Sequence, residues 1–184
     1  VCLMVDTQRT AAELLALFAD NQTAGAISAN DVRDFIASVT LPYGGGYMEG
    51  NATATTINTI DVFEDVAGTI TANSSLRDIT CSAGGVLTYT GAPVRHFHVV
   101  TNLSMTAASN NQVIKFAWYK NGTTKLPAEL HRKVGTGTDV GAASIHTDAM
   151  LSTGDTLQLK VANGTSTANV SIEYLYAFIM GMLV

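Results

Sequence analysis

The chain has 184 residues, the size of one domain or of one domain with a small appendage. Hydrophobic residues make up 47% of it, whereas charged residues make up only 14%, below the roughly 25% usual for soluble domains. The net charge of −5, with Arg132–Lys133 as the one basic cluster, argues against a nucleic-acid partner. The polar surface must therefore come from Thr, Ser, Asn and Gly, a composition atypical of metabolic enzymes. Two cysteines, Cys2 and Cys81, are compatible with one disulfide or with two separate thiols.

Residues 1–42 are predicted to form a helical hairpin. Thr10 followed by Glu13 makes a capping box that begins one helix, and Ser28 followed by Asp31 begins a second. Each helix carries an apolar stripe at helical spacing. A hairpin of this size is too small to be a domain of its own, so its stripes must pack on the rest of the chain, on sister subunits or on a host surface. We expect the hairpin to attach the trimer or to link it to its neighbours. The attachment residues that we predict are Leu14, Leu17, Phe18, Phe35 and Ile36.

The loop between these helices resembles an EF-hand calcium loop. Asp20, Gly25 and Asp31 match the first ligand, the sharp turn and the last ligand. However, Gln22 and Ala24 stand at the third and fifth positions, where oxygen ligands belong. An alanine side chain cannot bind calcium, so we favour a plain hairpin that turns at Gly25.

Residues 43–60 are predicted to be a linker rich in Gly and Thr. The run Gly44–Gly46 offers no side chains to pack, so we expect it to be a flexible joint. The Thr-rich run after it is expected to be extended or irregular.

Residues 61–184 are predicted to form a mostly β, antiparallel jelly-roll sandwich. Asn121–Gly122 is the strongest hairpin signal, and Trp118 just before it is expected to point into the core. Short strands at about ten-residue spacing are typical of sandwiches and jelly rolls. The strands that we predict cover 86–91, 94–105, 112–120, 130–134, 140–147, 156–162 and 170–184.

The last of these strands is apolar on both faces. Leu175, Ala177 and Ile179 lie on one face, and a second apolar set alternates with them. One face can pack into the core, so the other needs a second sheet or another copy of the chain, and we interpret this second cover as a subunit interface. The run is too short to cross a bilayer as a helix and carries Glu173, which excludes a membrane anchor. The subunit interface that we predict consists of Ile172, Tyr174, Tyr176, Phe178 and Met180.

Two segments resemble parts of bacteriophage virion proteins. The stretch from Phe116 to Ile172 is similar to the C-terminal half of phage virion proteins that have a tumour necrosis factor-like jelly roll. The shared motifs are W-Y-K-N-G and S-T-G-D-T-L-Q-L-K-V-A-N-G-T. The stretch from Leu14 to Ile36 resembles a short module near the N-terminus of phage fibre and decoration proteins. The resemblance implies a homotrimer in which the last strand of each subunit lies near the three-fold axis.

The resemblance and the composition together lead to an expected role. We expect a non-enzymatic virion structural protein, a capsid decoration (cement) protein that binds the major capsid protein and stabilises the head. The alternative is a head-fibre or tail-fibre tip that holds a host glycan or protein with its outer loops. A secreted signalling or lectin module is a third class, disfavoured because V-C-L-M-V lacks the features of a signal peptide. No cofactor, nucleic acid or membrane is expected as a partner.

The sequence offers no arrangement typical of catalysis. It contains no G-x-S-x-G elbow, and its carboxylates Asp139, Asp148 and Glu173 are scattered. Asp155 stands in a Gly-Asp turn, where a structural role is expected.

The histidines are the candidates considered for a metal, although none is expected. His96 and His98 are two apart on a predicted strand and therefore share a face, where a trimer could gather six imidazoles. His131 and His146 are further candidates. The simpler interpretation is a polar patch.

Overall fold

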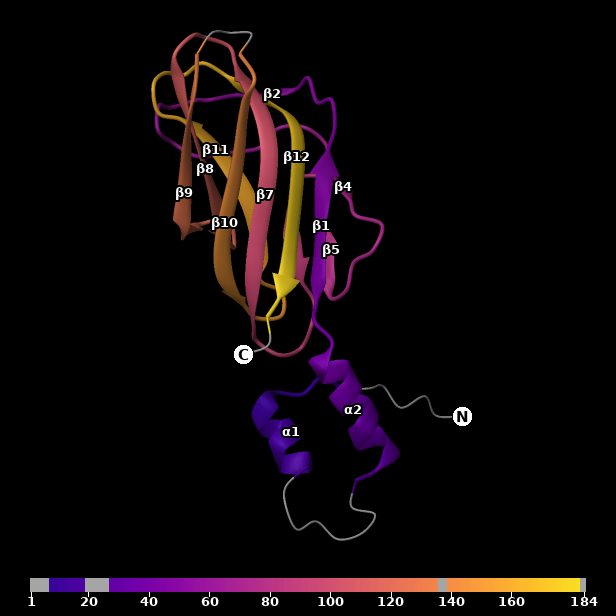
Figure 1. Cartoon of the computed structure of the whole chain (residues 1–184). Helices are drawn as coiled ribbons and strands as arrows, with labels where there is room; N and C mark the ends of the chain where they lie inside the picture. The colour runs from indigo at the N-terminus through magenta and orange to yellow at the C-terminus, as the bar shows by residue number, and fades with distance from the viewer. Residues whose placement is uncertain (1–6, 19–26, 136–138, 183–184) are drawn as a thin grey trace.

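The computed structural model describes residues 7–18, 27–135 and 139–182. A two-layered β-sandwich forms most of the molecule, and two short helices lie beyond one of its ends (Figure 1). The predicted fold class, an antiparallel β-sandwich preceded by a small helical hairpin, is confirmed.

Both helices begin at the predicted residues. Helix α1 is Ala11–Leu17 and helix α2 is Ala29–Val39. Glu13 N donates to the Thr10 hydroxyl while the Glu13 carboxylate accepts from Thr10 N at 2.7 Å, and Ser28 and Asp31 repeat the arrangement. Both capping boxes are therefore confirmed. The remaining positions of the EF-hand-like loop lie outside the described residues.

Twelve strands are formed by the described residues, most of them where the sequence predicts them. The short strands are β2 (Ala54–Thr55), β3 (Glu64–Asp65), β4 (Thr71–Ala72), β5 (Ile79–Cys81) and β6 (Leu87–Tyr89). The longer strands are β1 (Tyr43–Met48), β7 (Arg95–Ala107), β8 (Gln112–Lys120), β9 (Thr124–Val134), β10 (Gly141–Leu151), β11 (Thr156–Asn163) and β12 (Val170–Gly181).

The strands form two sheets in which every pair is antiparallel. The first sheet has the order β10-β7-β12-β1-β4, with β2 also pairing with β12, and is called the β12 sheet below. The second has the order β5-β6-β11-β8-β9, with β3 also pairing with β11, and is called the β11 sheet. The pairing of β1 with β12, from Tyr43↔Met180 to Met48↔Leu175, joins segments more than 100 residues apart in the chain.

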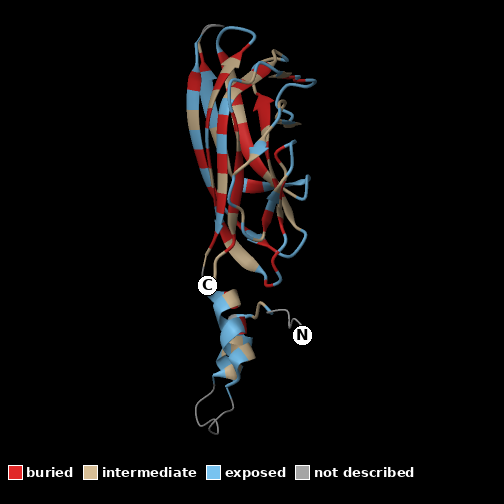
Figure 2. Ribbon diagram, turned by 90° about the vertical axis from the view of Figure 1, so that its right-hand side faces the viewer, coloured by how far each residue is buried: buried red, intermediate tan, exposed pale blue. Residues whose placement is uncertain are grey.

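The core lies between the two sheets and consists of the inward side chains of alternating positions. Figure 2 shows this alternation as buried and exposed bands along the strands. Trp118 is fully buried, which confirms its predicted inward orientation, and Tyr89 packs edge-on against Phe97 at 5.0 Å between ring centroids.

The prediction of a flexible joint at Gly44–Gly46 is wrong, because these glycines lie inside β1 and are buried. A Cβ on Gly44 would lie 2.7 Å from Ile79 Cβ, and one on Gly46 would lie 2.6 Å from Ile70 Cγ2. Here glycine is needed for the close approach of neighbouring groups rather than for flexibility.

Candidate interaction surfaces

The outward face of β12 is apolar and uncovered. Tyr174, Tyr176 and Met180 are 54%, 45% and 44% exposed, and Phe178 beside them is partly exposed. The alternate residues Leu175, Ala177 and Ile179 are buried in the core. The strand is therefore apolar on both faces, as the sequence predicts, and the chain itself covers only one of them.

Ile172 does not belong to this outward face, so its place in the predicted interface is wrong. The pairing of β12 with β7 shifts between Ile172, opposite Met105, and Tyr174, opposite Ser104. A β-bulge at Glu173 supplies one extra residue and moves Ile172 to the inner face, where it is fully buried.

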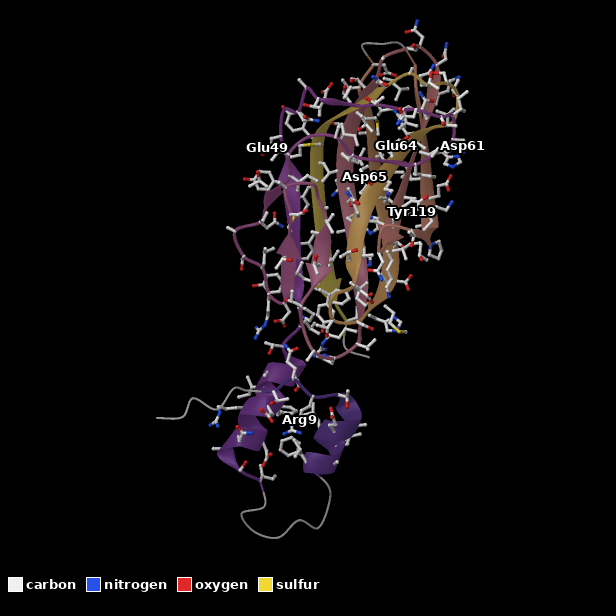
Figure 3. The ribbon with its side chains drawn as sticks, turned by 180° about the vertical axis from the view of Figure 1, so that it is seen from behind. Arg9, Glu49, Asp61, Glu64, Asp65 and Tyr119 are labelled. Carbon is white, nitrogen blue, oxygen red and sulfur yellow. The ribbon has the colours of Figure 1, made fainter. Side chains whose placement is uncertain are left out.

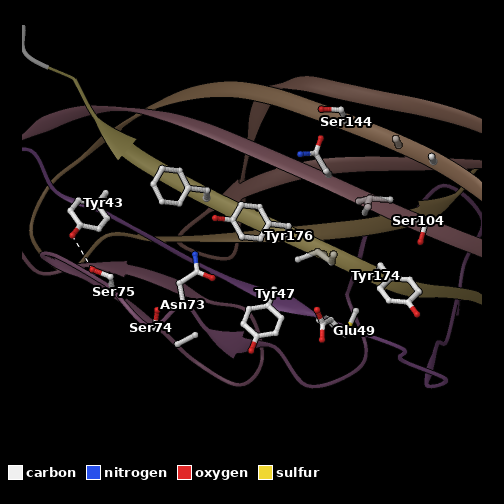
Figure 4. A pocket seen from close by; sticks show the side chains of 18 residues that line it. Tyr43, Tyr47, Glu49, Asn73, Ser74, Ser75, Ser104, Ser144, Tyr174 and Tyr176 are labelled. Carbon is white, nitrogen blue, oxygen red and sulfur yellow. Dashed lines mark hydrogen bonds between the residues drawn. The ribbon is translucent and has the colours of Figure 1, made fainter.

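An open groove of about 1270 Å³ runs along this outward face (Figure 4). Tyr43 and Tyr47 of β1 line it together with Tyr176 of β12, and residues 72–75 form one side. The Tyr43 ring stacks on Phe178 at 6.4 Å, and its hydroxyl lies 3.0 Å from Ser75 Oγ. Tyr43 and Tyr47 were not predicted as surface candidates, because residues 43–60 are predicted to be a linker. The pattern Y-G-G-G-Y nevertheless places both on one face of a strand.

The groove combines aromatic rings with uncharged polar groups. Asn73, Asn102 and Ser104 lie among the tyrosines, and Glu49 is the one charged side chain among the lining residues that the structure describes. Such a surface can bury aromatic area while its hydroxyls and amides find hydrogen-bond partners.

The outward face of the β11 sheet is different, because charged groups and a crossing segment cover it (Figure 3). The Phe63 ring packs on Tyr119 at 5.6 Å, and Lys160 Nζ bonds Asp65 Oδ1 at 2.8 Å. Lys160 also lies over the Tyr119 ring, 5.3 Å from its centroid. The two outer faces of the sandwich therefore differ, and among the residues that the structure describes the uncovered aromatic face belongs to the β12 sheet.

The helices carry a second exposed apolar surface. Phe18 and Phe35 meet edge-on at 5.4 Å between ring centroids, yet both remain exposed, as does Ile36. Leu14 and Leu17 are partly buried. The full set of exposed large apolar residues on the described part of the hairpin is Leu15, Phe18, Ile27, Val32, Phe35, Ile36 and Val39.

A buried carboxylate holds the segment before α1 against α2. The side chain of Asp34 is fully buried, accepts from Thr7 N at 2.8 Å and pairs with Arg9 Nη2 at 2.7 Å. The Thr7 N–H bond and the Arg9 guanidinium hold the pKa of Asp34 below its usual value. Arg9 N also donates to Ser38 Oγ at 2.7 Å.

Polar contacts join the hairpin to the sandwich. Gln8 Nε2 donates to Asp78 Oδ2 at 2.8 Å, and Gln8 Oε1 accepts from Ala92 N at 3.0 Å. Arg95 at the start of β7 donates to the Ser38 carbonyl oxygen at the end of α2. These hydrogen bonds therefore hold the hairpin against one end of the sandwich.

The histidines lie on both sheets of the sandwich. His96 and His98 share the outward face of β7 as predicted, and His98 Nε2 lies 3.3 Å from Nδ1 of His146 on β10. His131 lies on the other sheet, where it bonds Glu129 at 2.6 Å. Within the described residues, no group of three or more His, Cys, Asp or Glu is placed to hold a metal ion.

The carboxylates remain scattered in the fold. Asp155 accepts from Ser152 N at 2.8 Å and pairs with Lys120 at 2.8 Å, which confirms its predicted structural role. Desolvation raises its pKa, but hydrogen bonds from Asn121, Lys120 and Ser152 outweigh that and lower it to about 2. Glu173 marks the bulge, while Asp139 accepts from Gly135 N at 2.8 Å.

Solved structures of other proteins resemble this chain in fold. No protein-family model matches the chain, and no curated protein does. The solved structure of Eiger TNF from S. frugiperda is similar with a TM-score of 0.50 and 14% identity, over 78% of this chain and 94% of that one. The globular domain of zebrafish complement 1qA follows with a TM-score of 0.49 and 12% identity, over 78% and 97%. The sandwich therefore has a tumour necrosis factor-like jelly-roll fold, as predicted.

None of the helices among the described residues is both long and apolar enough to span a bilayer.

Proposed function

We propose that the chain is a homotrimeric, non-enzymatic structural protein of a bacteriophage virion that decorates the capsid surface and stabilises the head. The observation that carries the proposal is the presence of two separate apolar surfaces that the chain leaves uncovered. One is the aromatic face of the β12 sheet, and the other is the stripe of the helical hairpin. A protein with one surface for its own copies and one for a foreign surface is suited to link parts of a larger assembly.

The trimer is proposed to form through the outward face of β12. Tyr174, Tyr176, Phe178 and Met180 would be buried against neighbouring subunits, and each would contribute about 25 cal/mol for every Å² of its apolar surface that is removed from water. The contrast with the β11 sheet, whose outer aromatics are shielded by lysines, supports this choice of face.

The hairpin is proposed to bind the major capsid protein. Phe18, Phe35 and Ile36 are exposed on the hairpin, which lies beyond one end of the sandwich (Figure 1), so they can reach a partner without unfolding the jelly roll. Leu14 and Leu17 are partly buried, so they contribute less exposed area to this surface.

The loops at the end of the sandwich away from the helices favour decoration over adhesion. Residues 108–111 and 164–169 consist of Ala, Ser, Asn, Thr and Gly. A receptor-binding tip would be expected to place aromatic and polar side chains together on such loops. The alternative function, a head-fibre or tail-fibre tip that binds a host glycan, draws its support from the tyrosine-lined groove instead.

Electron microscopy of purified virions labelled with an antibody against this chain tests the proposal. Label spread over the heads is the expected result. Label confined to the tail tip or to sparse spikes would favour the fibre alternative, and binding of host glycan through the groove would then be measured. Virions without label would reject both.

A further inference from the structure

The pair His98 and His146 is spaced like two ligands of one metal ion. Their facing nitrogens, His98 Nε2 and His146 Nδ1, lie 3.3 Å apart, and the ring centroids are 5.3 Å apart. Since Zn–N bonds are about 2.0–2.1 Å, two nitrogens on one tetrahedral ion are separated by about 3.3–3.4 Å. Without an ion, the same contact is a hydrogen bond between the two rings, so the spacing suits both states.

We infer that His98 and His146 form a binding site for a divalent transition-metal ion of the class that imidazole prefers, such as Zn²⁺. The two histidines come from neighbouring antiparallel strands, β7 and β10, which fix their separation. Both side chains are exposed, so an ion can reach them without any change in the core. Water completes the coordination, because only these two imidazoles are in place.

Ser144 supplies a second and independent observation. Its hydroxyl lies 3.3 Å from His146 Nε2, on the side of the ring away from His98. We assign the ring proton to Nε2, which donates to Ser144 and leaves the Nδ1 lone pair directed at the metal position. Metal-bound histidines commonly have their other nitrogen held in this way.

One acidic side chain lies beside the pair. Asp148 lies opposite His98 across the β7–β10 pair and faces outward with it. It is not placed as a third ligand, but its negative charge favours the approach of a divalent cation.

Isothermal titration calorimetry with Zn²⁺ on the tag-free chain tests the inference. The expected result is one ion per chain. His98→Ala and His146→Ala should each weaken binding by at least about tenfold, since losing even an outer partner of a ligand costs about 10–100-fold. Ser144→Ala should weaken it by about tenfold while both ligands remain.

His131→Ala is the matched control, because His131 is an exposed histidine on the other sheet that bonds Glu129. The His131→Ala variant should bind Zn²⁺ with the same affinity as the unaltered chain. Binding that persists in the His98→Ala/His146→Ala double variant, or falls equally in His131→Ala, would overturn the site. Circular dichroism of each variant confirms that the fold is retained, and the result does not depend on the proposed function.

Discussion

At the residue scale, two features decide how the candidate interface is built. Glycines in β1 let neighbouring groups approach closely, and the bulge at Glu173 determines which side chains of β12 face outward. Strict alternation backward from buried Leu175 would have placed the charged Glu173 in the core, and this conflict was the sequence signal for the bulge. A triple glycine, by contrast, looks the same in a flexible joint and in a crowded strand, so sequence could not distinguish the two.

Replacement of Gly45 by alanine should destabilise the sandwich. An added Cβ would lie 2.0 Å from the Ala177 carbonyl oxygen, a backbone atom that cannot move aside without breaking the β1–β12 pairing. We expect a loss of about 1–3 kcal/mol or more in the free energy of unfolding, measured by urea denaturation. Gly84→Ala is the control, because its added Cβ would meet only Ser82 Oγ at 3.8 Å. Equal stability of the two variants would contradict the close-approach explanation.

Acid should release the segment before α1 through Asp34. The pKa of this carboxyl is lower in the folded chain than its usual value of 3.8, so its stabilisation is present above that value. The stabilisation is lost as the pH falls through the lowered pKa. The protection factors of the α2 amides, which compare their exchange with that of an unfolded chain at the same pH, should therefore fall below about pH 4.

The variant Asp34→Asn provides the comparison for this acid effect. It loses the ion pair with Arg9, so α2 should already exchange faster at neutral pH and change less on acidification. An identical acid response in both chains would show that another group controls the hairpin.

At the element scale, periodicity and turn signals located the long strands and both helices well. The predicted strand at 112–120 matches β8, and the capping boxes gave both helix starts. Strands β1 to β5 were missed. The glycines of β1 look like a flexible joint, and strands of two or three residues depend on neighbours distant in the chain and leave no periodic pattern. The groove was missed for the same reason, since residues 72–75 and Tyr47 come together only through the pairing of β1 with β4.

Two substitutions on β12 should separate core from interface. Ile172→Ala removes a fully buried side chain and should lower the free energy of unfolding by about 2–5 kcal/mol. Tyr176→Asp changes an exposed side chain, so the fold should survive while the proposed trimer dissociates to monomers or aggregates. Thermal melting and light scattering after size-exclusion chromatography measure the two effects. A soluble, intact trimer from Tyr176→Asp would reject this interface.

At the scale of the whole molecule, the jelly roll and the hairpin have separate tasks in the proposed function. The sandwich has its own core, whereas the hairpin is joined to it through Gln8 and Arg95. Fold class and the general division into helical and β parts could be predicted from the sequence. The groove and the His98–His146 pair could not, since both depend on strand order and register.

Removal of residues 1–40 should therefore abolish attachment but leave self-association. We expect the truncated chain to retain its β-type circular dichroism spectrum and the trimer mass, because the aromatic face of β12 is untouched. Binding to capsids stripped of the protein, measured by co-sedimentation, should be lost. A truncated chain that still co-sediments would assign attachment to the sandwich.

The antiparallel pairing of β1 with β12 also determines how the molecule carries a mechanical load. Helix α2 leads directly into β1, so tension on the hairpin is applied along β1. The bonds between β1 and β12 run across the strands and are loaded in shear, all at the same time, from Tyr43↔Met180 to Met48↔Leu175. A pair of strands loaded in this direction separates only when all of its hydrogen bonds break together. Strands that are pulled apart from one end lose their hydrogen bonds one at a time and need less force. If the chain decorates a capsid as proposed, the direction of these two strands would resist swelling of the particle as much as the strength of any single contact does.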